Sequence, residues 1–157
     1  MNIRVLAIDP GLLFSGFVVY DGKEILDFGK IDNFAMLEYI ANKNYDTCVI
    51  ERIASYGMAV GESVLETIFW SGRFYQVADN ADKAIYRIYR KDVKVNICGS
   101  TRAKDSNIIQ ALKDRFEPGL EHGKKPKGVL KGITADVWQA LALCITYTDT
   151  CLTDKNK

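Results

Sequence analysis

The chain opens with an apolar run, Ile3-Arg4-Val5-Leu6-Ala7-Ile8-Asp9, which breaks immediately afterwards at Pro10-Gly11. A short run dense in branched residues predicts a buried central β-strand. A second strand is predicted over Phe14–Tyr20, and Asp21-Gly22 is a strong hairpin signal before a third strand over 24–28. The sequence therefore predicts three consecutive antiparallel strands at the start of the chain.

The remaining sequence alternates helical and extended patterns. Helices are predicted over 34–42, 63–80, 104–116 and 134–148, the first capped by Asn33, and strands over 47–50 and 93–98. The basic, glycine-containing segment 117–132 is predicted to be a mobile loop. With no internal repeat or low-complexity linker, this order predicts one α/β domain over 1–157, a mixed five-stranded sheet flanked by helices.

The predicted helix over 63–80 carries apolar residues on nearly every side. A helix of this kind is covered all round. Two arrangements satisfy that condition, and the sequence leaves both open. The helix packs on the sheet with one face and on a second subunit with the other, or it is buried entirely within one chain.

Charge is distributed unevenly although the net charge is only +1. Residues 83–131 hold 13 of the 21 Lys and Arg residues and five of the 20 acidic ones. Such a segment is typical of a phosphate-binding surface, and a solvated lysine-rich face is the alternative.

Several classes of protein are disfavoured by composition. His122 is the only histidine and the four cysteines are dispersed, which argues against a Cys/His zinc site and against a histidine-dependent nucleophile. No apolar run approaches the roughly 18 residues of a membrane span, and the N-terminus lacks a signal-peptide pattern. A cytoplasmic protein without membrane partners is predicted.

Three acidic residues occupy the ends of predicted elements: Asp9 and Glu51 end strands, and Asp136 lies in the first turn of the last helix. If the first and fourth strands are parallel neighbours, Asp9 and Glu51 emerge together at the edge where α/β sheets bind ligands. Small residues such as Ala140 let the last helix approach that edge. Singly, each acid also fits a turn, surface or helix-start role. Together, beside a basic segment, they favour an oxygen-ligand site for Mg²⁺ or Mn²⁺.

Three motifs resemble those of RuvC-type Holliday junction resolvases, a family of bacteria and their phages. The motifs are Ile8-Asp9-Pro10-Gly11 with Ser15-Gly16, Val49-Ile50-Glu51, and Asp136-x-x-Gln139-Ala140-Leu141-Ala142-Leu143. The resemblance covers essentially the whole chain in order and spacing. It implies an RNase H-like fold, a homodimer formed through the helix over 63–80, and paired symmetric nicks across four-way DNA junctions. The implied cofactor is Mg²⁺, with Mn²⁺ able to substitute.

The resemblance also implies which residues act. Asp9, Glu51 and Asp136 match the catalytic, metal-binding carboxylates of the family. Gln139 stands where the family has a fourth acid. Its amide oxygen can serve as a ligand but contributes no charge, so the number of bound ions, one or two, is left open.

The basic segment matches as well, since Val95-Asn96-Ile97-Cys98-Gly99-Ser100 followed by Thr101-Arg102-Ala103-Lys104 resembles the family's strand, turn and DNA-contacting lysine. Lys104 is the first candidate for a phosphate contact that assists catalysis, and Arg102 the second. Lys94 is a DNA-binding candidate on spacing alone. Tyr56 is a candidate for stacking at the junction centre, and an exposed tyrosine with no such role is the alternative.

Other functions fit parts of the pattern. A ribonuclease of the same fold would use the same three carboxylates. A non-catalytic module that binds branched DNA would explain Gln139, although such a module gains nothing from three acids beside a phosphate backbone. An actin-like ATPase would need a second subdomain and a much longer chain.

Overall fold

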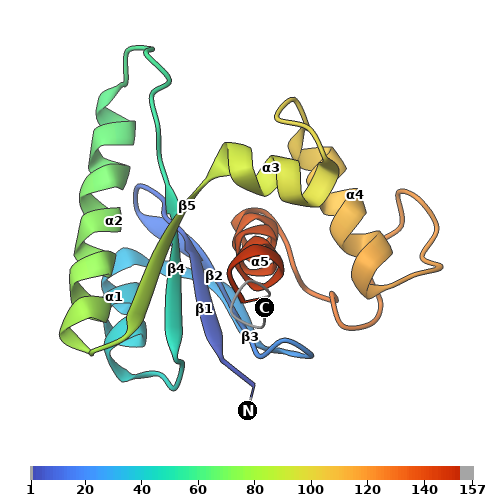
Figure 1. Ribbon diagram of the computed structural model, residues 1–157, viewed down its shortest axis with the longest axis horizontal. Helices are drawn as coiled ribbons and strands as arrows, with labels where there is room; N and C mark the ends of the chain where they lie inside the picture. The colour runs from blue at the N-terminus through green and yellow to red at the C-terminus, as the bar shows by residue number, and fades with distance from the viewer. Residues whose placement is uncertain (1, 153–157) are drawn as a thin grey trace.

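The structure, a computed structural model, describes residues 2–152, which are built around one sheet (Figure 1). Its five strands are β1 (Val5–Asp9), β2 (Phe14–Tyr20), β3 (Ile25–Asp32), β4 (Thr47–Arg52) and β5 (Ala84–Tyr89), in the spatial order β3-β2-β1-β4-β5. The first three strands are antiparallel, whereas β4 is parallel to β1 and β5 is parallel to β4. The predicted mixed sheet is confirmed.

Helices cover both faces of this sheet (Figure 1). On one face lie α1 (Asn33–Asn42) and α2 (Glu62–Asn80). On the other lies α5 (Asp136–Tyr147), flanked by α3 (Arg90–Cys98) and α4 (Asp105–Phe116) and followed by a short π-helical turn, η1 (Thr148–Leu152). Within residues 2–152, no helix combines the length and the hydropathy needed to cross a bilayer.

The opening strand is apolar from Val5 to Ile8 because both of its faces are buried there. Leu6 and Ile8 pack toward α1 and α2, whereas Val5 and Ala7 pack toward α5. Alternate residues of a strand point to opposite faces, so one short run contributes to two cores. The sequence run that predicted a central strand therefore separates two hydrophobic layers, one on each face of the sheet.

The predicted fifth strand over 93–98 is wrong, because these residues belong to α3 and the strand lies upstream at Ala84–Tyr89. Apolar residues at 93, 95 and 97 alternate as in a strand, but Val93 and Ile97 stand one helical turn apart and pack against the core around α5. Val95 is left exposed. Gly99, in the left-handed conformation with φ of 74°, ends the helix.

Smaller boundary predictions are also corrected. The third strand continues past residue 28 to Asp32, so that Lys30 belongs to the sheet. Asp32 caps α1 by accepting a hydrogen bond from the Ala35 N–H, whereas the predicted cap, Asn33, is buried. Segment 117–132 has no regular structure, as predicted, but Glu117 accepts hydrogen bonds from three of its backbone N–H groups. Its mobility stays a prediction.

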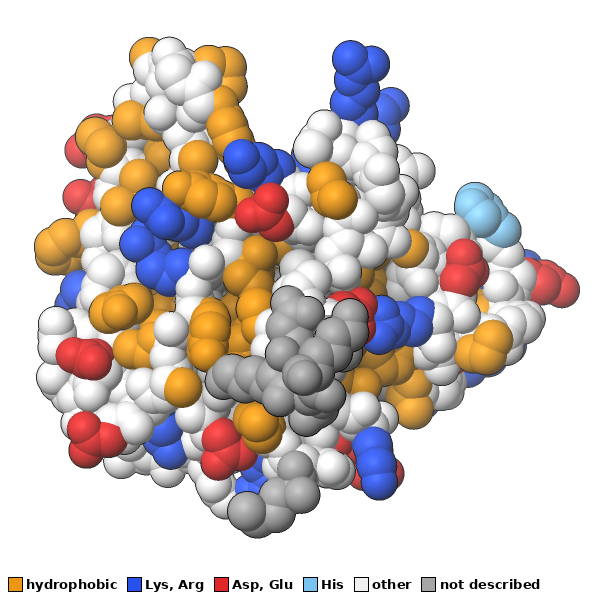
Figure 2. Space-filling model, viewed as in Figure 1, with side chains coloured by type: hydrophobic (Ala, Val, Ile, Leu, Met, Phe, Trp, Pro, Cys, Tyr) orange, Lys and Arg blue, Asp and Glu red, His pale blue; other side chains and the backbone are white. Residues whose placement is uncertain are grey.

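Helix α2 is covered by its own chain on one side only. Ser71, Phe74 and Ala78 are its buried residues, so complete burial within one chain is excluded. The uncovered surface carries large apolar side chains: Leu65, Ile68, Phe69 and Tyr75. In Figure 2, hydrophobic side chains reach the outer surface on the left, where α2 lies.

Candidate nuclease site

One row of residues across the sheet carries much of the candidate site. Asp9 ends β1 and pairs with Gly16 of β2, which in turn pairs with Lys30 of β3. On the other side of β1, the parallel register pairs Ile8 with Ile50, so the residues that follow them, Asp9 and Glu51, also lie side by side. Residues in one row share a face of the sheet. The predicted meeting of Asp9 and Glu51 is confirmed.

Asp136 reaches this row because α5 begins directly against β2. A Cβ atom on Gly16 would lie 2.8 Å from the backbone carbonyl carbon and oxygen of Asp136, so only glycine permits this approach. Ala135, the residue before the helix, adopts φ of 43°, a conformation that costs an alanine free energy. Strain of this kind is typical of residues held in place by a functional site.

The acids interact strongly. The side chains of Asp9 and Glu51 are hydrogen-bonded to each other. Burial raises the pKa of Asp9 from 3.8 to about 9, and the hydrogen bond with Glu51 and the charges of Glu51 and Asp136 act in the same direction. A carboxyl group in this position stays protonated at neutral pH unless a cation compensates its charge.

Two cationic side chains that the sequence analysis did not identify contact these acids. Lys30 Nζ lies 2.6 Å from Asp136 Oδ2. Arg90 Nη1 lies 3.7 Å from Glu51 Oε1, while Nη2 lies 2.6 Å from Asp105 Oδ1 at the start of α4. Both residues were missed because strand boundaries were misplaced: Lys30 lay outside the predicted third strand, and Arg90 directly follows the true end of β5.

The loop after Asp9 is fixed by buried polar contacts. The Ser15 hydroxyl donates to Asn33 Oδ1 over 2.7 Å and accepts from the Gly11 N–H. The Asn33 amide donates to the carbonyl oxygens of Gly11 and Leu12. Asn33 therefore holds the loop rather than capping α1, and Asp9 is presented from a well-anchored turn.

The available donors fit a divalent metal ion. Gln139 lies on the same face of α5 as Asp136, and its Oε1 atom is buried with no hydrogen-bond partner among the described residues. A buried acceptor without a partner is costly, and coordination of a cation would satisfy it. Within residues 2–152, however, no three acidic, histidine or cysteine side chains converge as a ready metal cage, and Asp136 is in contact with Lys30. Oxygen donors of this type suit Mg²⁺ or Mn²⁺.

Basic and aromatic residues lie next to Arg90, the ion-pair partner of Glu51. Tyr56 and Lys94 line one cavity of about 350 Å³ together with Arg90, Lys91 and Thr101. The structure thus brings two predicted DNA-binding residues beside the partner of Glu51. In Figure 2, Lys and Arg side chains lie at the base and on the right of the hollow between the β4–α2 and α3–α4 loops.

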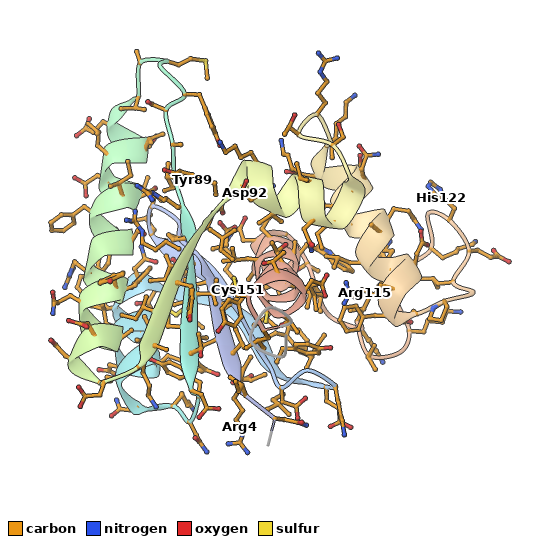
Figure 3. All side chains as sticks on the ribbon, in the orientation of Figure 1. Arg4, Tyr89, Asp92, Arg115, His122 and Cys151 are labelled. Carbon is orange, nitrogen blue, oxygen red and sulfur yellow. The ribbon has the colours of Figure 1, made fainter. Side chains whose placement is uncertain are left out.

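The other two predicted DNA-binding residues are Lys104 and Arg102. Lys104 is exposed and immediately precedes Asp105, the ion-pair partner of Arg90. Arg102 lines a different cavity, formed with α4 and His122. Figure 3 shows Tyr89 and Asp92 on either side of the β5–α3 boundary that carries Arg90, whereas His122 lies beyond α4 at the edge of the molecule.

Comparison with known proteins identifies the fold. No protein-family model matches the chain, and no curated protein sequence is similar to it. Among solved structures, the mixed sheet and its helices match an RNase H-like fold, that of RuvC from Thermus thermophilus. The TM-score is 0.71 at 16% sequence identity, with 96% of each chain covered.

Two further structures agree with that match. The first is T. thermophilus RuvC in complex with a Holliday junction substrate, with a TM-score of 0.72, 16% identity, and 97% of this chain and 96% of that chain covered. The second is the yeast mitochondrial Holliday junction resolvase Ydc2, with a TM-score of 0.58, 12% identity, and 93% and 78% covered. The chain therefore has the RNase H-like fold of these resolvases.

Proposed function

We propose that this protein is a divalent-metal-dependent endonuclease that resolves four-way DNA junctions by paired, symmetric nicks. The observation that carries this proposal is the row of carboxylates at the carboxyl edge of an RNase H-like sheet, next to a cavity lined by cationic and aromatic side chains. The acids supply metal ligands, and the basic rim supplies contacts for a phosphate backbone.

The proposed ligands of the metal are Asp9, Glu51, Asp136 and Gln139, with Mg²⁺ as the natural ion and Mn²⁺ as a substitute. When bound, the ion would supply Lewis acidity for phosphodiester hydrolysis. The protein contributes the geometry. Asn33 and Gly16 fix the two backbone segments that carry Asp9 and Asp136, so binding of a cation would require rearrangement of side chains rather than of the backbone.

The DNA is proposed to lie across the hollow beside Arg90. Lys94 and Arg102 would contact phosphates, and Tyr56, with an exposed side chain on the loop after β4, would stack on a base at the opened junction centre. Lys104 is proposed to contact the phosphate nearest the acids, because its neighbour Asp105 is tied through Arg90 to Glu51.

Paired nicks require two sites, and we propose that α2 provides the contact between two copies of the chain. Its uncovered apolar residues would be buried in a symmetric interface. We also place the protein in the cytoplasm of a bacterial or phage-infected cell. The four cysteines are all free thiols, which agrees with a reducing compartment.

The test is cleavage of a labelled synthetic four-way junction in Mg²⁺, beside a linear duplex and an RNA–DNA hybrid, with Asp9→Asn as the control. We expect symmetric nicks near the crossover that are absent with Asp9→Asn, while junction binding is retained. Cleavage of the hybrid alone would identify a ribonuclease. Tight junction binding without any cleavage would identify a binding module, with Gln139 as the mark of lost activity.

A further inference from the structure

The contact between Lys30 and Asp136 is unusual for a site that is to hold cations. Lys30 Nζ and Asp136 Oδ2 are 2.6 Å apart, and both side chains remain almost half exposed. An ion pair this exposed contributes little to stability, because water screens it. The ion pair matters because of its position: it places the positive charge of Lys30 next to Asp136, one of the proposed metal ligands.

The sheet register explains how Lys30 reaches Asp136. Lys30 stands in the same row as Asp9, separated from it only by Gly16. Because Gly16 has no side chain, the start of α5 fills the space above it, and Asp136 lies between the positions of Lys30 and Asp9. Lys30 is therefore directed toward Asp136 by the backbone, rather than reaching it by chance from a flexible loop.

The charges of the site differ from those of a site built for two divalent ions. Three carboxylates face two cationic side chains, Lys30 and Arg90, and Arg90 is also shared with Asp105, which lies 2.6 Å from its Nη2. Gln139, the remaining oxygen donor on α5, is neutral. A first divalent cation would be balanced by the carboxylates of Asp9 and Glu51, whereas a second would have to bind next to the ammonium group of Lys30, with the neutral amide of Gln139 as its remaining ligand.

We propose that the site binds one divalent cation, at Asp9 and Glu51, and that Lys30 supplies the second positive charge of the site beside Asp136. This inference rests on the proposed nuclease function and specifies its metal requirement. Asp136 Oδ2 is engaged by Lys30, which leaves Oδ1 for the ion held by the other two acids. Lys30 is a positioning residue, because it acts through Asp136.

The test measures metal binding directly. Mn²⁺ is titrated into the full-length protein, and free Mn²⁺ is quantified by electron paramagnetic resonance, with and without an uncleavable four-way junction. We expect one Mn²⁺ per chain for the wild type and for Lys30→Arg, which keeps the charge. Lys30→Gln should bind its ion about 3–10-fold more tightly, because a repelling charge is removed. Lys30→Gln combined with Gln139→Asp should bind two.

Other results would contradict the inference. Two Mn²⁺ per wild-type chain would overturn it, even if the junction is cut as proposed, as would a Lys30→Gln variant with unchanged Mn²⁺ affinity. A single Mn²⁺ per chain, with tighter binding by Lys30→Gln, would support it even if no junction is cleaved, in which case only the nuclease proposal fails. Circular dichroism of each variant checks folding, and Lys30→Gln alone decides the question if the double variant does not fold.

Discussion

The pKa of Asp9 depends strongly on the side chains around it. Asp9 is largely buried, shares a hydrogen bond with Glu51, and feels the charge of Asp136, while Arg90 only partly offsets these effects. A carboxyl group in this environment opposes its own ionisation. The same cluster that would bind a metal is therefore a weak point of the metal-free fold.

Replacing Asp9 with Asn should stabilise the metal-free protein in alkaline buffer. The raised pKa means that Asp9 binds its proton more tightly in the folded than in the unfolded chain. Its contribution to stability is full below about pH 3.8, the unfolded value, and is lost as pH rises toward about 9. Urea unfolding in EDTA at pH 8 should show Asp9→Asn more stable than wild type by about 1–3 kcal/mol.

The matched condition is the same measurement at pH 5, where the difference should shrink. Adding Mg²⁺ at pH 8 should stabilise the wild type more than Asp9→Asn, since only the wild type has the full set of charges to compensate. An equal response of both proteins to Mg²⁺ would contradict the assignment of Asp9 as a ligand.

Sequence patterns located the acids but not the cations around them. Asp9 and Glu51 stand at or near the ends of short buried strands, which the sequence defines clearly, and Asp136 is the first residue of a strongly apolar helix. Lys30 and Arg90 depend on the register of β3 and on the true position of β5. Register depends on residues that are far apart in the sequence. No local pattern around Lys30 therefore predicts that it lies beside Asp136, above a glycine of the neighbouring strand.

Among the secondary-structure elements, β5 and α3 show where local patterns fail. Apolar alternation over 93–98 suggested a strand, whereas tertiary packing of Val93 and Ile97 around α5 favours the helix. Strand β5 is an edge strand with a charged residue, Arg87, in its middle, which weakened its own signal. Helix α2 was located almost to the residue, because its length and apolar content admit no other element.

Helix α2 carries the prediction on assembly. Phe69 is 61% exposed in the single chain, so Phe69→Glu should leave the fold intact and place a charge at the proposed contact between copies. We expect sedimentation to show a dimer for the wild type and a monomer for Phe69→Glu, with paired nicking lost.

The control is Leu26→Glu, which places the same charge at an exposed apolar position on β3, away from α2. It should remain dimeric. A monomeric wild type, or dimers of both variants, would rule out α2 as the interface.

Across the whole molecule, charge is separated along the chain. Residues 83–131, which hold most of the basic side chains, form the edge strand β5, helices α3 and α4, and the segment after α4. Residues 1–82 contain 12 of the 20 acidic side chains, among them Asp9 and Glu51. Attraction of a DNA backbone toward these basic elements would bring its phosphates next to the acids. A bound cation would then be needed to offset the repulsion between phosphate and carboxylate.

Junction binding should therefore weaken steeply with salt. A plot of the logarithm of the association constant against that of salt concentration should be linear, and Lys94→Ala should reduce its slope by about 1, the value of one phosphate contact. Lys43→Ala is the control, because Lys43 ends α1 and stacks on Tyr39 away from the basic elements. It should leave the slope unchanged. Equal slopes for wild type and Lys94→Ala would remove Lys94 from the interface.

The placement of α5 has a consequence for when the proposed activity would appear during synthesis. Asp9 and Glu51 leave the ribosome early, but Asp136 and Gln139 arrive only with the helix that also covers Val5, Ala7, Val18 and Val49. A nascent or truncated chain that lacks α5 therefore has neither a closed core nor a complete set of acids. The nuclease activity proposed for this protein would therefore appear only in the step that completes its fold.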